Sequence, residues 1–187
     1  MTTSNDNHGL DQAKAQAESI AAMIAAINCD YDRLQELRDE REALADALVD
    51  AEIGEIGGSA DEVREASEAR AALAEWDIEN AEELQALEID AGECADQDDA
   101  REIVQNDPLS VEVRSGWTSH GDTMTPEEFR IVLCTGGPHV EIRGELDNGT
   151  PSRAWMMYQD WGTPLTQYFD IEGSTLLAYC QEFYFEG

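Results

Sequence analysis

Basic residues are scarce in this sequence. Its 187 residues include 42 Asp and Glu but only 11 Lys and Arg, which gives a formal net charge of −31. Because so negative a surface repels phosphate groups, we expect no direct binding to DNA, RNA or an anionic membrane. Hydrophobic residues still make up 42% of the chain, a content that is typical of folded proteins and argues against full disorder.

Long hydrophobic runs and cysteine motifs are also missing. The longest near-continuous apolar stretch, residues 20–27, is far shorter than the ~20 residues of a membrane-spanning helix. The N-terminus is polar and acidic, unlike a secretion signal, so the sequence predicts a protein of the cytoplasm. No cysteine lies in a C-x-x-C pair, and we expect reduced, buried thiols. These cysteines are Cys29, Cys94, Cys134 and Cys180.

Histidine is rare, and the signatures of catalytic sites are absent. The three histidines, His8, His120 and His139, form no H-x-x-x-H or H-x-x-E arrangement, so we expect no metal centre. Glycine-rich phosphate-binding motifs are missing as well, and we predict that the protein has no cofactor and is not an enzyme. The alternative is a Cys134 nucleophile with His120 or His139 as base; a buried cysteine at a strand end is the preferred interpretation.

The composition changes at Asp107-Pro108. Residues 1–107 contain 30 acids and 7 bases, whereas residues 108–187 contain 12 acids and 4 bases. Aromatic residues are concentrated in the second part, since only Tyr31 and Trp76 precede the boundary. We therefore predict two domains, an acidic helical domain over residues 1–107 and an α+β domain over residues 108–187.

The first part has the apolar periodicity of antiparallel helices. Apolar residues recur every three or four positions from Ile20 to Leu34, and the spacing slips near Leu37. This favours a helical hairpin or small bundle over a long dimeric coiled coil. Glycines 54, 57 and 58 predict the end of the first helix, and Ser59 with Glu62 predicts a capping box that starts the second. Residues 80–91 and 98–106 are expected to form further short helices.

The second part has the pattern of an antiparallel sheet. Short runs rich in β-branched and aromatic residues are separated by glycine-containing turns, which predicts a meander. Ser174 is expected to cap a final helix over residues 176–183 that covers one side of the sheet. The fold class is thus predicted as α+β. The expected strands are 109–113, 129–133, 140–146 and 153–158.

Several short segments carry a family resemblance. They include Pro108-Leu109-Ser110-Val111, Leu133-Cys134-Thr135-Gly136-Gly137-Pro138 and Tyr158-Gln159-Asp160-Trp161-Gly162-Thr163-Pro164. With these segments the second part, and more loosely residues 29–34, resembles a family of uncharacterised small acidic proteins encoded by bacteriophages, prophages and other mobile elements. The resemblance implies an accessory protein acting in a bacterial cytoplasm, and it implies no catalytic residues.

Carboxylates are densest between Asp30 and Glu55. As a helix this segment would be roughly 38 Å long at ~1.5 Å per residue. Its ten acids would then lie about 4 Å apart, close to the ~3.4 Å between phosphates along one DNA strand. We predict that they bind a partner. They are Asp30, Asp32, Glu36, Asp39, Glu40, Glu42, Asp46, Asp50, Glu52 and Glu55.

Charge, its position and the resemblance together predict a nucleic-acid mimic. The expected function is inhibition of a host defence system, of the anti-CRISPR or anti-restriction type, by occlusion of a basic groove without catalysis. The expected partner is a basic nucleic-acid-binding protein of the bacterial host. Asp160 and Trp161, which lie in an unusual turn, are added as partner-binding residues, with a packed turn as the alternative. The alternative function is a non-catalytic adaptor that binds through its sheet, and a homodimer is also considered.

Overall fold

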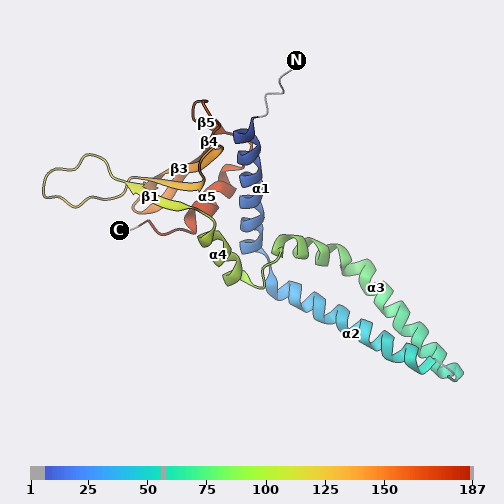
Figure 1. Cartoon of the computed structure of the whole chain (residues 1–187). Coiled ribbons are helices and arrows are strands. Elements are labelled where there is room, and N and C mark those ends of the chain that lie inside the picture. Colours follow the sequence, from blue (N-terminus) through green and yellow to red (C-terminus); the bar gives the residue numbers. More distant parts are fainter. Residues whose placement is uncertain (1–6, 56–57, 186–187) are drawn as a thin grey trace, which may run out of the picture. The chain divides into compact units, whose positions relative to one another are not determined.

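The structure is a computed structural model that describes residues 7–55 and 58–185. In this part the chain forms four helices, a five-stranded antiparallel sheet and a C-terminal helix, which confirms the predicted α+β class (Figure 1). The described residues fall into two compact units. One, the hairpin unit, lies within residues 28–96; the other, the sheet unit, comprises residues 7–27 and 97–185.

The hairpin unit consists of two antiparallel helices, α2 (Tyr31–Glu55) and α3 (Ala60–Ala91). Two ion pairs establish the direction, because Arg33 contacts Glu83 while Glu52, further along α2, contacts Arg70. The predicted hairpin is therefore present. So is the capping box at the start of α3, where the Glu62 carboxylate accepts a hydrogen bond from the Ser59 N–H.

Seam residues recur in both helices at intervals of three and four. This spacing keeps one narrow stripe of each helix against the other, as in a short antiparallel coiled coil. In α2 the stripe contains Leu34, Leu37, Arg41, Leu44 and Leu48, and in α3 it contains Ala66, Ala69, Leu73, Trp76, Asn80, Leu84, Leu87 and Ala91. Because the seam of α3 continues to Ala91 without a glycine or proline, the separate helix expected over residues 80–91 is wrong.

Of the three glycines predicted to end the first helix of the hairpin, two lie in the described residues. Helix α2 continues through Gly54 to Glu55, so Gly54 does not end it. Gly57 lies outside the described residues, whereas Gly58 directly precedes the cap residue Ser59.

The sheet unit is a meander in which neighbours in sequence pair in space. Its strands run in the order β1-β2-β3-β4-β5, all antiparallel. All four expected strands are present, with shifted ends, and the short β5 is an addition that the sequence reading missed. The strands are β1 (Ser110–Arg114), β2 (Glu128–Cys134), β3 (His139–Asp147), β4 (Thr150–Gln159) and β5 (Thr166–Tyr168).

One face of the sheet carries the core. A row of buried side chains crosses four strands, and helix α5 (Gly173–Gln181) adds Leu176 and Tyr179 to the same core. The expected helical cap at Ser174 is wrong. Glu172 is the cap residue, and the Ser174 hydroxyl donates a 2.7 Å hydrogen bond to its carboxylate. The row consists of Ile131, Ile142, Met156 and Tyr168.

The predicted domain boundary at Asp107-Pro108 does not separate the two units. Helices α1 (His8–Asn28) and α4 (Gln97–Asn106) belong to the sheet unit, although both lie in the part of the sequence that was predicted to form an acidic helical domain. Gly9 shows why, since a Cβ on it would lie 3.0 Å from the backbone of Gln159 and Asp160 at the end of β4. Packing, rather than composition, thus divides the chain after residue 27 and before residue 97.

The apolar series from Ile20 to Leu34 was expected to mark one continuous helix, and it is instead divided between α1 and α2. The break falls at Cys29 and Asp30. Asp30 caps α2, because its carboxylate accepts a 3.0 Å hydrogen bond from the Arg33 N–H and its carbonyl accepts one from Leu34. A single capping aspartate therefore assigns the two halves of one periodic series to different units.

Tyr179 ties α5 to the residue that follows α4. Its side chain is fully buried, and its hydroxyl donates a 2.6 Å hydrogen bond to the Asp107 carboxylate. Burial, and then the contact with Asp107, raise the pKa of this phenol well above its usual range. The folded protein therefore keeps the phenol protonated at a pH where the unfolded chain has lost the proton.

We expect Tyr179→Phe to lower the free energy of unfolding by about 1–3 kcal/mol at pH 7, because a buried charge-assisted hydrogen bond is lost. A group with a raised folded pKa contributes stability that is complete below its unfolded pKa and is lost above it. Wild type should therefore lose stability as the pH rises above ~10, and the variant should lose less. Urea unfolding from pH 7 to 11 measures both effects. Parallel pH profiles for the two proteins would contradict the assignment.

Candidate functional site

An unbroken acidic stripe runs along α2 on the side opposite its seam. Successive members are three or four residues apart, so they lie on one face of the helix. All six are exposed, whereas Leu34 and Leu37 on the opposite face are buried. At ~1.5 Å per residue the stripe extends about 27 Å, with one carboxylate per roughly 5 Å. We call it the α2 acidic stripe: Asp32, Glu36, Asp39, Glu42, Asp46 and Asp50.

Each arginine of α2 contacts a carboxylate of α3, and Arg33 also lies 3.5 Å from the stripe member Glu36. Arg33 binds Glu83 through two nitrogens, each 3.0 Å from a carboxylate oxygen, and the contact lowers the pKa of Glu83. Arg41 lies 3.0 Å from Asp77. Arg38 contacts Glu88 in the same way. These cross-helix ion pairs therefore hold positive charge beside α3 that would otherwise neutralise the α2 acidic stripe.

Several stripe carboxylates keep their charge unpaired. In the described ranges, Asp32, Glu42, Asp46 and Asp50 form no ion pair with a lysine or arginine. Asp39 accepts only an amide hydrogen bond, 2.6 Å from Gln35. These charges are therefore available to a cationic partner, at the modest cost of removing exposed groups from water.

The other predicted partner-binding acids have structural contacts of their own. Asp30 is the cap of α2, Glu40 accepts a 3.1 Å hydrogen bond from the Trp76 indole, and Glu52 lies 3.0 Å from Arg70. The side chain of Glu55 lies outside the described residues. The ten acids predicted together thus divide into a six-residue exposed stripe, three structural groups and one that is not described.

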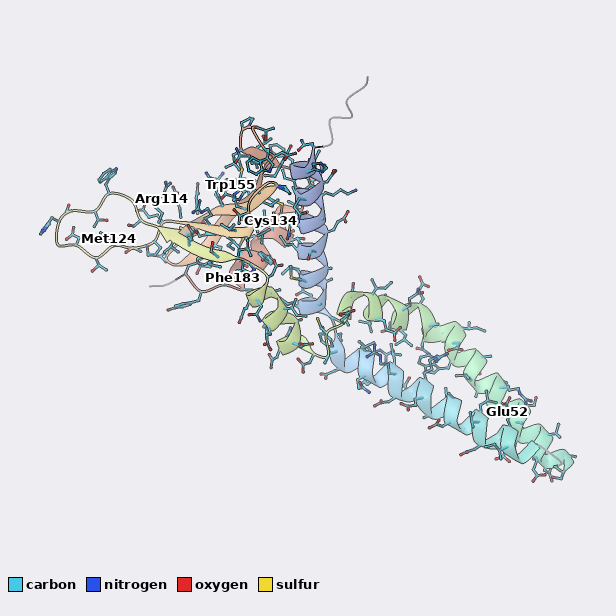
Figure 2. All side chains as sticks on the ribbon, in the orientation of Figure 1. Glu52, Arg114, Met124, Cys134, Trp155 and Phe183 are labelled. Carbon is cyan, nitrogen blue, oxygen red and sulfur yellow. The ribbon has the colours of Figure 1, made fainter. Side chains whose placement is uncertain are left out.

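A second stripe of exposed acids follows the outer side of α3. Figure 2 shows oxygen-tipped side chains projecting from both helices of the hairpin. Residues 28–96 contain 23 acids and 5 bases, a net charge of −18 that exceeds half of the total. Like charges spaced in this way repel each other, so the apolar seam and its cross-helix arginines must hold them. The α3 stripe consists of Asp61, Glu65, Glu68, Glu75, Glu79 and Glu82.

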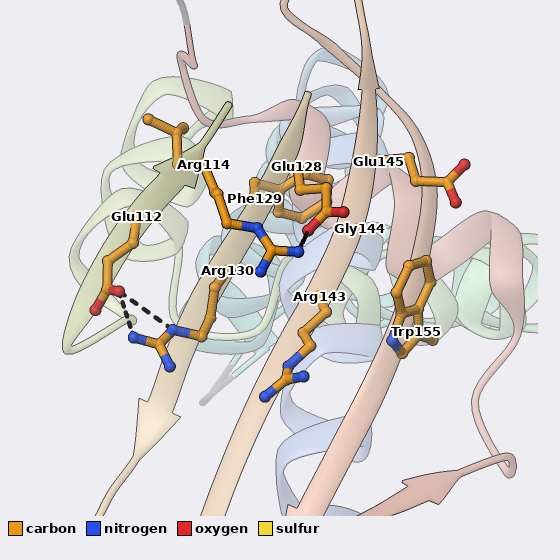
Figure 3. Close-up of a pocket in the computed structure, with 10 residues that line it drawn as sticks. Glu112, Arg114, Glu128, Phe129, Arg130, Arg143, Gly144, Glu145 and Trp155 are labelled. Atoms are coloured by element: carbon orange, nitrogen blue, oxygen red, sulfur yellow. Dashed lines mark hydrogen bonds and ion pairs between the residues drawn. The ribbon is translucent and has the colours of Figure 1, made fainter. Parts of the chain in front are cut away.

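The face of the sheet opposite the core is a charged ladder of a different kind. All four arginines of residues 108–187 lie on it, and each contacts a glutamate. The cross-strand register places Arg114, Glu128, Glu145 and Arg153 in one row, and Glu112, Arg130, Arg143 and Trp155 in the next. A groove of about 620 Å³ lies between these rows (Figure 3).

Glu141 anchors the arginines of the second row. It is only 1% exposed, and its carboxylate oxygens lie 2.6 Å from Arg143 Nε and 3.1 Å from His139 Nε2. Arg130 completes the cluster at 3.8 Å and also contacts Glu112, which lowers the pKa of Glu112. This face is therefore balanced in charge, in contrast to the hairpin.

Asp160 and Trp161 lie in a closed turn. The Asp160 carboxylate accepts a 2.7 Å hydrogen bond from the Trp161 N–H, and the Asp160 N–H donates to the Thr163 hydroxyl at 3.0 Å. Trp161 is 79% exposed and lies directly over Gly137, where a Cβ would be 1.8 Å from the indole nitrogen. The turn matches the packed alternative for Asp160, and its role in partner binding stays a prediction.

Among the residues that the structure describes, neither histidine that was considered as a base contacts the Cys134 thiol. Burial raises the pKa of Cys134, and its sulfur lies 3.8 Å from the Pro138 carbonyl oxygen. His139 is engaged with Glu141, and His120 lies in the exposed β1–β2 loop. Such surroundings favour the neutral thiol over the reactive thiolate.

Metal-ligand sets and membrane-spanning helices are both absent from the part of the chain that the structure describes. Within residues 7–55 and 58–185, no three His, Cys, Asp or Glu side chains gather as a set of metal ligands. None of the helices in the same part combines the length and apolarity that a membrane crossing requires. All four cysteines are free thiols.

Comparisons with known proteins identify no relative. No protein-family model matches the chain, and neither a curated protein nor a solved structure matches it.

Proposed function

We propose that the protein is a non-catalytic inhibitor of a host defence system, of the anti-CRISPR or anti-restriction type. Its hairpin unit occupies the basic groove with which a bacterial protein holds nucleic acid. The observation that carries this proposal is the α2 acidic stripe of regularly spaced, exposed carboxylates. Among the described residues, only Glu36 of this stripe contacts an arginine, at 3.5 Å from Arg33, and the other five members form no ion pair.

The charge arrangement suits occlusion better than mere solubility. A solvated helix face needs only scattered charges of both signs. On α2, in contrast, each arginine contacts a carboxylate of α3, and only Arg33 also contacts a stripe member, Glu36. Fixed carboxylates attract a cationic groove over long range, and they replace phosphates without the cost of ordering a flexible chain. Binding of this kind is competitive with nucleic acid and requires no chemical step.

Affinity capture from a bacterial lysate tests the proposal. We expect the immobilised protein to retain one or few nucleic-acid-binding proteins at low salt and to release them as the salt concentration rises, because exposed ion pairs are screened. Partners without a basic groove, or retention that is the same at about 0.05 and 0.5 M salt, would contradict the proposal.

The charge-balanced groove of the sheet unit favours a second candidate function, the adaptor. Trp155 lines this groove and is half-buried, so that it offers a partner both an apolar face and neighbouring charges. If the adaptor function holds, Trp155→Ala abolishes capture while changes in the α2 acidic stripe leave it intact. The inhibitor function predicts the reverse result.

A further inference from the structure

The outer edge of β1 is open and carries alternating apolar and charged side chains. β1 is the first strand of the sheet order, and among the described strands it pairs only with β2. An edge strand presents unpaired N–H and C=O groups to any added strand. Val111 is 39% exposed and Val113 is 50% exposed, and the preceding Leu109 is 62% exposed. Such an edge is a site for strand addition.

We propose that the edge of β1 pairs with β1 of a second copy of this chain, in an antiparallel register centred on Val113. The two copies would form one continuous ten-stranded sheet about a two-fold axis. The inference does not depend on the proposed function of the hairpin unit, since only residues of the sheet unit take part.

Charge selects this register over its neighbours. In a two-fold antiparallel pair, one residue lies opposite its own copy at the axis, and residues at equal distances before and after it lie opposite each other on the same face. Each possible register is therefore named by its central residue. Centring on Glu112 opposes two glutamates, and centring on Arg114 opposes two arginines. Centring on Val111 leaves Arg114 opposite Pro108. Only the register centred on Val113 opposes Glu112 of each copy to Arg114 of the other.

The same register joins the charged ladders of both copies. Within one chain Arg114 contacts Glu128 and Glu112 contacts Arg130. Across the axis the order becomes Glu128, Arg114, Glu112 of the partner and Arg130 of the partner, with alternating signs throughout. Each new pair of opposite charges stabilises the dimer, and like charges at the same positions would weaken it.

Apolar side chains meet on the other face of the extended sheet. Val113 opposes its own copy, and an extended continuation after Arg114 opposes the fully exposed Trp117 to Leu109 of the partner. Residues 115–117 follow β1 without a turn before the β1–β2 loop. One register therefore matches two charges and three exposed apolar side chains of each copy.

A charge-swap mixture tests the proposal. Sedimentation equilibrium at about 0.3 M NaCl, where the repulsion between two copies is screened, should show a concentration-dependent dimer for the wild type. In a dimer of Arg114→Glu, both cross-strand pairs place a glutamate opposite Glu112 of the other copy. In a dimer of Glu112→Arg, both pairs place an arginine opposite Arg114 of the other copy. Each variant alone should dimerise at least tenfold more weakly. An equimolar mixture should form a heterodimer with the affinity of the wild-type dimer, because both cross-strand pairs are then of opposite sign.

Arg153→Glu is the matched control. It reverses an arginine of the same face and removes one contact with Glu145, but it lies on β4, away from the axis. It should dimerise like the wild type, and circular dichroism should show all variants folded. A wild type that stays monomeric at every concentration, as expected if a different protein supplies the added strand, overturns the proposal. A mixture that stays monomeric, or a control that weakens as much as Arg114→Glu, also overturns it.

Discussion

Neutralising four carboxylates of the α2 acidic stripe should abolish capture of the partner. The variant carries Asp39→Asn, Glu42→Gln, Asp46→Asn and Asp50→Asn, which keep shape and hydrogen-bonding capacity while removing four negative charges. If each carboxylate contributes about 1 kcal/mol in a groove, the loss is about 4 kcal/mol, or roughly a thousandfold in affinity. Titration of the captured partner with labelled wild type and variant measures this loss.

A control with the same net charge separates position from total charge. Asp11, Glu102, Asp122 and Asp170 are exposed acids of the sheet unit. Neutralising these four should leave the affinity within a few-fold of wild type, because they lie outside the hairpin. Equal losses in both variants would show that only bulk charge matters. The four-acid stripe variant should also be at least as stable as wild type, since like charges along one helix face repel.

Gly144→Ala should strongly destabilise the sheet unit. A Cβ at Gly144 would lie 2.2 Å from the Arg153 carbonyl oxygen and 2.2 Å from Phe129 Cζ. The first contact is with the backbone of the neighbouring strand and the second with a buried ring that packs 4.7 Å from Phe185. Neither can move away without disturbing the core, so we expect a loss of about 2–4 kcal/mol.

Denaturant unfolding followed by tryptophan fluorescence measures the effect. Gly173→Ala is the control, since a Cβ there meets nothing within 4 Å. It should change the free energy of unfolding by less than about 1 kcal/mol. Adding Phe129→Leu to Gly144→Ala should restore part of the lost stability, because it shortens the side chain in conflict. No recovery would assign the whole conflict to the backbone of Arg153.

Local signals in the sequence were sufficient for most elements. Three features depend only on residues within about four positions of each other in the chain. They are the capping pair Ser59 and Glu62, the strand patterns of residues 109–158 and the seam around Leu34 and Leu37. Each of these features is present in the structure. The stripe of exposed acids could likewise be read from intervals of three and four residues.

The division into units could not be predicted from composition. Helix α1 is alanine-rich like the hairpin, yet it packs in the sheet unit through Gly9 and a stripe of small and branched residues. Whether a helix packs against another helix or a sheet depends on contacts between residues far apart in sequence. The same holds for Arg41, whose partner Asp77 lies 36 residues away.

The fate of the positive charges also required the structure. The sequence shows Arg33, Arg38 and Arg41 among acids at several spacings, any of which satisfies an i,i+3 or i,i+4 rule. Their contacts with α3 decide that the outer face of α2 keeps its charge.

Because β5 is only three residues long, it carries too little pattern to be recognised.

Competition with double-stranded DNA for the captured partner tests whether the hairpin unit occupies the groove in which that partner holds nucleic acid. The partner, loaded with a labelled DNA duplex, is titrated with the protein while fluorescence anisotropy reports bound DNA. We expect the protein to release the DNA completely, and added DNA to raise the apparent dissociation constant of the protein in proportion to the DNA concentration. A stable complex that contains the partner, the DNA and the protein together would contradict this expectation.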